Sequence, residues 1–182
     1  AVPGWTGAST ADVMGTGGVH APIGFNTTDR YDGTSWAASA TLTRATCYGM
    51  DGATAAPGAT ALIFGGSFYP PTTVTADTEA FDGTSWSEKN NLNTARFYAG
   101  GAGTSTAAME VGGATPSLTT VVEFWDGTSW TEGSDIATAG DKMSASGNGL
   151  TQCIISSGTN PSITTDCFEY AVPTAIKTFT AS

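Results

Sequence analysis

The pentapeptide Asp32-Gly33-Thr34-Ser35-Trp36 occurs three times in the sequence, returning unchanged at 82–86 and at 126–130. An Asp-Gly pair between two strand-like segments indicates a β-hairpin, since glycine supplies the positive φ that a tight turn requires. An aromatic residue stands directly before each copy: Tyr31, Phe81 and Trp125. The sequence therefore contains a repeated unit in which a hairpin joins two strands that each carry an aromatic side chain.

Other parts of the unit repeat as well. An aliphatic residue follows each Trp of the motif by six positions, as Leu42, Leu92 and Ile136. A double glycine closes an apolar run at Gly65-Gly66 and at Gly112-Gly113. Glycine at the end of a strand permits a sharp bend or a close approach between backbones. Each unit is therefore predicted to contain four short antiparallel strands, the second ending at the double glycine and the fourth carrying the Trp.

The aromatic residues of the repeat are expected to form the core between neighbouring sheets. The predicted core residues are Trp5, Tyr31, Trp36, Phe81, Trp86, Trp125, Trp130 and Tyr170. They divide a repeat domain over residues 1–170 into units of approximately 5–31, 36–81, 86–125 and 130–170. The remaining segment, 171–182, is expected to be a C-terminal strand or tail.

Charge and hydropathy exclude several functions. Six Lys and Arg residues stand against 16 Asp and Glu residues, which gives a net charge of −10. Nucleic-acid binding is not expected, because contacts to phosphate need clustered basic side chains. No membrane insertion is expected either, because the sequence has no apolar run of the length that spans a bilayer. The chain starts at Ala1 without an initiator Met, as expected of a processed chain or a piece of a longer protein.

The sequence contains no recognisable catalytic or metal-binding set of residues. His20 is the only histidine, and nothing marks a nucleophile or a second base beside it. One histidine and three scattered cysteines provide no zinc site. We therefore expect a protein that is not an enzyme and that has no cofactor and no metal. Cys153 and Cys167 flank a hairpin predicted around residue 160, where they form either a cross-strand disulfide or two small core residues.

The repeat is similar to a known family. The order Arg96, Gly112-Gly113, Trp125, Trp130, at a spacing of 44 to 50 residues, resembles the kelch repeat. In style the repeat is closest to kelch-like proteins of marine and environmental bacteriophages. The resemblance implies an all-β protein, a kelch-like β-propeller with about four blades here. Kelch propellers usually have six or seven blades.

The first unit is short by one strand, so we expect a terminal strand to complete one blade. Completion within the chain would close a four-bladed ring. Completion between chains would use 171–182 to exchange a strand with another copy, giving an oligomer or a filament.

Two functions agree with these features. The first is a non-enzymatic structural subunit of an extracellular assembly, a virion decoration or fibre component or a surface filament, that associates with copies of itself and with other virion or cell-surface proteins. The alternative is a recognition module that binds a glycan or a protein through loops at 67–75, 114–120 and 158–164. Phe68 and Tyr69 are then the expected exposed anchors.

Overall fold

The computed structural model describes residues 4–9, 12–20, 23–44, 47–53, 60–68, 73–147, 152–156, 158–160, 162–163, 167–171 and 177–179. All regular secondary structure in these ranges is β, and most of it belongs to four antiparallel sheets of four strands each. We number these sheets I to IV in chain order. In each sheet the strands are hydrogen-bonded in the order in which they occur in the sequence, as predicted for the repeat.

The four sheets have the following strands. Sheet I contains β1 (Gly4–Ser9), β2 (Asp12–Thr16), β5 (Thr28–Tyr31) and β6 (Trp36–Ala38). Sheet II contains β8 (Asp51–Gly52), β9 (Ala61–Phe64), β12 (Thr78–Phe81) and β13 (Trp86–Lys89). Sheet III contains β14 (Gly100–Thr104), β15 (Ala107–Val111), β16 (Val122–Trp125) and β17 (Trp130–Glu132). Sheet IV contains β18 (Ser144–Gly147), β19 (Gln152–Ser156), β22 (Cys167–Ala171) and β23 (Lys177–Phe179).

Shorter strands extend the connections between the second and third strands of three sheets. They are β3 (Val19–His20) with β4 (Ile23–Gly24), β10 (Ser67–Phe68) with β11 (Thr73–Val74), and β20 (Thr159–Asn160) with β21 (Ser162–Ile163). One further strand, β7 (Cys47–Tyr48), lies in the segment between sheets I and II and pairs with β10. The connection that carries β10 and β11 is thereby attached to the segment that enters its own sheet.

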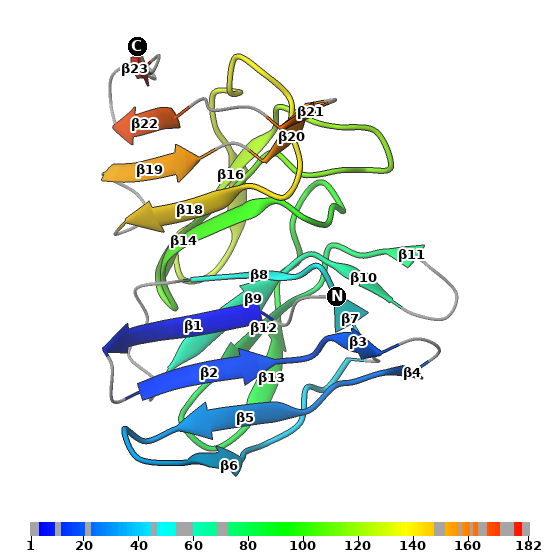
Figure 1. Cartoon of the computed structure of the whole chain (residues 1–182), viewed down its shortest axis with the longest axis vertical. Coiled ribbons are helices and arrows are strands. Elements are labelled where there is room, and N and C mark those ends of the chain that lie inside the picture. Colours follow the sequence, from blue (N-terminus) through cyan, green and yellow to red (C-terminus); the bar gives the residue numbers. More distant parts are fainter. Residues whose placement is uncertain are drawn as a thin grey trace.

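The sheets follow one another through space as they do in the sequence. The first strands of consecutive sheets lie side by side, β1 against β8, β8 against β14, and β14 against β18. Sheet I stands at the bottom and sheet IV at the top of the view in Figure 1. The described residues form no closed ring, so closure of a four-bladed ring within the chain stays a prediction.

Three apolar clusters fill the three interfaces between consecutive sheets. The predicted aliphatic positions lie in them, and each is anchored by its backbone to the preceding sheet. The Leu42 N–H donates to Asn26 O at 2.8 Å, that of Leu92 to Ala76 O at 3.0 Å, and that of Ile136 to Thr120 O at 3.0 Å. Each linker thus leaves a sheet, places one aliphatic side chain in the interface, and enters the next sheet.

Two expectations about the repeat boundaries need correction. Sheets I to III each end after their Trp strand, because the Asp-Gly hairpin pairs that strand with the aromatic strand before it. The predicted units, which begin at Trp, cut this hairpin in two. With the correct boundaries sheet I is complete, and Trp5 lies in its first strand. In the predicted tail, β23 is the fourth strand of sheet IV in its own chain, so no strand exchange through 171–182 is needed.

The Asp-Gly-Thr-Ser segment forms a four-residue hairpin loop. The Asp32 carboxylate accepts the N–H of Thr34 at 2.8 Å and that of Ser35 at 2.9 Å, and Gly33 has a φ of 98°. Asp82 and Asp126 make the same two hydrogen bonds in their own loops. These backbone N–H groups stabilise the ionised form and lower the pKa of all three exposed carboxyls. The loop is longer than the two-residue turn that an Asp-Gly pair favours, because the carboxylate bridges it.

Candidate functional site

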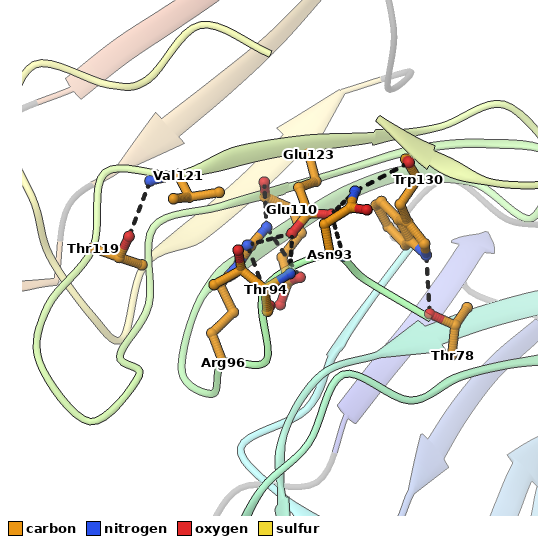
Figure 2. Close-up of polar contacts among 9 residues, drawn as sticks. All are labelled: Thr78, Asn93, Thr94, Arg96, Glu110, Thr119, Val121, Glu123 and Trp130. Carbon is orange, nitrogen blue, oxygen red and sulfur yellow. Dashed lines mark hydrogen bonds and ion pairs between the residues drawn. The ribbon is translucent and has the colours of Figure 1, made fainter. Parts of the chain in front are cut away.

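The Trp of each buried motif reaches across to the preceding sheet. Trp86 donates its indole N–H to Thr28 Oγ1 in sheet I at 3.1 Å, and Trp130 donates to Thr78 Oγ1 in sheet II at 2.9 Å (Figure 2). Both indoles are buried, with 5% and 6% of their surface exposed. Each also packs on the aromatic residue across its hairpin, Phe81 at 5.3 Å and Trp125 at 5.5 Å between ring centroids. The aromatic pair therefore belongs to the interface with the preceding sheet.

Sheet I has the same pair, but its Trp is exposed to solvent while its Tyr is partly buried. The Tyr31 and Trp36 rings are 5.4 Å apart and inclined by 40°, against 42° and 44° for the buried pairs. Trp36 is nevertheless 49% exposed, because no sheet among the described residues precedes sheet I. We call the face of sheet I that carries Asp29, Tyr31 and Trp36 the aromatic face. The prediction that Trp36 is a core residue is wrong for the chain by itself. Trp5 and Tyr170 lie in β1 and β22, and their side chains are outside the described residues.

A buried ionic cluster lies between sheets II and III (Figure 2). Glu123 accepts the backbone N–H groups of Asn93 at 2.7 Å and Thr94 at 3.1 Å, both from the linker between the two sheets. Arg96, from the end of the same linker, donates to Glu123 Oε1 at 2.7 Å. The carboxylate therefore fixes the linker and neutralises the arginine at the same point.

The same arginine also holds Glu110. Arg96 Nη2 lies 3.2 Å from Glu110 Oε2 and donates to the Glu110 carbonyl at 3.2 Å, and both side chains are fully buried. Gly65 makes room for them, since a Cβ there would lie 2.8 Å from Glu110 Oε1 and 2.7 Å from the Arg96 carbonyl oxygen. Its φ of 60° is also one that side chains rarely adopt. The first glycine of the double-glycine pair is thus required by the ionic cluster.

A second cluster repeats this arrangement between sheets I and II. Glu79 accepts the N–H of Thr43 at 2.8 Å and that of Arg44 at 3.1 Å, and Arg44 Nε lies 3.2 Å from Glu79 Oε1. Arg44 follows the Trp of its motif by eight positions and Arg96 follows its own by ten, so the two arginines are two positions out of register. Both nevertheless reach the equivalent glutamate. The signal for these glutamates was in the sequence, because an acidic residue stands two positions before the aromatic in Glu79-Ala-Phe81 and in Glu123-Phe-Trp125.

The buried cluster contains two carboxyls that favour the protonated form. Burial raises the pKa of Glu110 to about 7, since the nearby Glu123 carboxylate adds to the effect while Arg96 and Arg44 only partly oppose it. Burial and the charge of Glu110 also raise the pKa of Asp51, which lies in β8. Neither Glu110 oxygen accepts a hydrogen bond within the described part of the chain. The cluster is therefore stable with a proton on Glu110.

We expect the stability of the protein to fall between about pH 4.5 and about pH 7. The folded state holds a proton on Glu110 that the unfolded chain has already lost in this range, so rising pH favours unfolding. Above this range the loss is complete. Asp51 acts in the same direction, whereas the lowered pKa values of Asp32, Asp82 and Asp126 cost stability only as the pH falls below the ordinary range of an Asp carboxyl.

Chemical unfolding of the wild type and of Glu110→Gln, followed across this pH range, measures the effect. The stability of the variant should depend much less on pH over this range, because glutamine has no proton to release. An equally steep fall in the variant would show that Glu110 is not the group responsible.

The predicted disulfide does not form. Cys153 and Cys167 are not joined to each other, and Cys153 is buried with its sulfur 3.9 Å from that of Met109. In the hairpin register Cys153 pairs with Tyr170, and Cys167 pairs with Ser156. The two cysteines are thus three positions out of register and lie on opposite faces of sheet IV. The error came from placing the centre of the hairpin at residue 160.

The predicted recognition anchors are not both exposed. Phe68 is partly buried and packs against the apolar cluster between sheets I and II, and Tyr69 is outside the described residues. Another row occurs at equivalent positions of the three linkers. Tyr48 and Tyr98 have ring centroids 6.1 Å apart, and Lys142 Nζ lies 5.8 Å from the Tyr98 ring. We call Tyr48, Tyr98 and Lys142 the linker row.

The described residues include no helix with the length and apolar character needed to cross a membrane. Within the same ranges, no three His, Cys, Asp or Glu side chains are grouped so that they could hold a metal ion. His20 lies in β3, the first strand of a small hairpin.

No protein-family model matches the sequence, and no curated protein is similar to it.

Proposed function

We propose that this protein is a non-enzymatic structural subunit of an extracellular or virion assembly, and that it associates with copies of itself through the aromatic face of sheet I. The observation that supports the proposal is the Tyr31–Trp36 pair, in which Trp36 is 49% exposed and Tyr31 is partly buried, and which has the ring geometry of two pairs that are buried against a neighbouring sheet. Half-exposed tryptophan is costly to hydrate and is enriched in protein–protein interfaces. The aromatic face is therefore a half-exposed surface of the kind that is buried between consecutive sheets elsewhere in the chain.

We propose further that the four sheets are blades of a kelch-like propeller. The sequential strand order, the contact between the first strands of consecutive sheets and the double glycines all support this. Such blades are stabilised chiefly by their neighbours. An open row of blades therefore has two end faces that a further blade can cover, which agrees with self-association.

The mass of the native particle tests the proposed self-association. Sedimentation velocity over a range of protein concentrations should show species heavier than the 18.3 kDa monomer for the wild type. Trp36→Ser should weaken this association at least about 30-fold, as loss of an interface hot spot does. Thr84→Ser, in the exposed hairpin loop of sheet II, should associate like the wild type. A wild type that stays monomeric at every concentration would contradict the proposal.

The alternative, a recognition module for a glycan or a protein, has one observation in its favour. Tyr98 and Lys142 of the linker row have φ values of 55° and 53°, which residues other than glycine seldom adopt. Backbone strain of this kind tends to occur at functional sites. The alternative predicts a monomer whose loops bind a ligand, so the same mass measurement separates it from self-association.

A further inference from the structure

We propose that the aromatic face of sheet I binds the outer face of sheet IV in a second copy of the chain, so that the copies join head to tail. The inference rests on the proposed self-association and names the surface that the aromatic face contacts. Each surface has an exposed large apolar side chain, Trp36 on the aromatic face and Ile154 on sheet IV, and the two lie at opposite ends of the described row of sheets. The contact would repeat, between copies, the aromatic-pair interface that occurs twice within the chain, between sheets I and II and between sheets II and III.

The interfaces within the chain are all of one kind. In each of the first two, the later sheet contributes an aromatic pair and the earlier sheet contributes its opposite face, where a threonine accepts the indole N–H. No interface within the described residues joins two aromatic faces. Among the described residues, no sheet precedes the aromatic face of sheet I and none follows the outer face of sheet IV. A second copy supplies both at once.

The outer face of sheet IV has the apolar residue that such an interface needs. In the earlier sheets the equivalent position of the second strand is held by Met14, Leu62 and Met109, all fully buried under the next sheet. The strand registers place Ile154 at this position, since it pairs with Glu169 as Met109 pairs with Phe124. Ile154 is 61% exposed, the most exposed large apolar side chain described. Sheet IV therefore carries an uncovered receiving face.

The register also identifies the neighbour of Trp36 in the second copy. Thr28 and Thr78, which accept the indole N–H groups, pair with the residue two positions after Met14 and Leu62 respectively. The equivalent residue of sheet IV is Cys167, which pairs with Ser156. Its thiol is free and only partly buried. A sulfur atom accepts an N–H hydrogen bond weakly, so this contact should be looser than those within the chain.

Charge favours this contact over a symmetric one. Asp29 lies on the aromatic face, exposed to solvent, at the position that Glu79 and Glu123 occupy in their sheets. Two aromatic faces meeting across a two-fold axis would bring two Asp29 carboxylates into one interface, and like charges there oppose binding. In the head-to-tail contact Asp29 faces a different surface. Contacts of this heterologous kind form a ring if the rotation closes and a filament if it does not.

Two variants that each block one surface test the inference. Trp36→Lys blocks the aromatic face and Ile154→Lys blocks the receiving face, and both positions are exposed enough that the fold should persist. Each variant alone should lose self-association by at least about 30-fold in sedimentation velocity. An equimolar mixture should recover it as a heterodimer and stop there, because each pair retains one intact contact. Thr84→Lys, in the exposed loop of sheet II, should associate like the wild type.

The failures of the two proposals are distinguishable. A wild type that remains monomeric overturns both. A wild type that associates while Ile154→Lys associates equally well overturns only the head-to-tail contact, because the receiving face is then not used. If the equimolar mixture does not regain association, the head-to-tail contact is overturned as well. Unchanged thermal unfolding of the two variants confirms that loss of association is not loss of fold, and Trp36→Ser with Ile154→Ser repeats the comparison without added charge.

Discussion

Replacing Trp130 by alanine should lower the free energy of unfolding by about 3–5 kcal/mol, the range for removing a large buried aromatic side chain. Only 6% of the Trp130 surface is exposed, and its ring packs on Phe64 and Trp125. Its removal leaves a cavity between sheets II and III and takes the donor away from the buried hydroxyl of Thr78. Denaturant-induced unfolding, followed by circular dichroism, measures the loss.

The matched control is Trp36→Ala, which changes the same residue of the same motif. Trp36 is 49% exposed, so in the monomer its loss should cost about 1 kcal/mol or less. The comparison must be made at a dilution where the protein is monomeric, because association would stabilise the wild type. Equal losses for the two variants would contradict the distinction between a covered and an uncovered aromatic pair.

Replacing Arg96 by methionine should also lower the stability by about 3–5 kcal/mol, the cost of breaking a buried ion pair on one side. Arg96 is fully buried and lies between the carboxyls of Glu110 and Glu123. Methionine fills much of the volume but leaves Glu123 without its counter-charge. Urea unfolding of the variant, compared with the wild type under the same conditions, gives the change.

Lys142→Met is the control for charge at the surface. Lys142 lies 3.7 Å from Asp141 in an exposed ion pair, and such pairs contribute within about 1 kcal/mol. The two substitutions remove the same charge and add the same side chain. If Lys142→Met proved as destabilising as Arg96→Met, burial of the ion pair would not be the reason for the effect.

The sequence predicted the sheets well because their signals are local. The hairpin that joins the third and fourth strands of sheets I to III follows from five adjacent residues, and the aliphatic residue that recurs six positions after each Trp of the motif lies in an interface. The boundaries of the units were wrong for a physical reason. A repeat fixes the period but not the starting point, and only the strand pairing shows that Trp36 closes a sheet and does not open one.

The candidate site was predicted only in part, because it depends on contacts between distant residues. The importance of Trp36 followed from the motif, whereas its exposure depends on the sheet that is missing beside it. The acidic residue two positions before each aromatic could have been noticed, but nothing local shows that Glu123 binds a linker 30 residues earlier in the chain. The disulfide failed for a related reason, since an error of a residue or two in the hairpin centre moves a side chain to the opposite face.

The single kind of interface between consecutive sheets has a consequence for how such a chain can change in length. Duplicating one sheet together with its linker creates a new junction of the same type as the existing ones. Deleting one sheet with its linker removes a junction and creates no junction of a different type. In either case the first sheet still presents its aromatic pair, and the last still presents its receiving face. Gene duplication could therefore alter the size of the subunit while leaving the surfaces at its two ends unchanged.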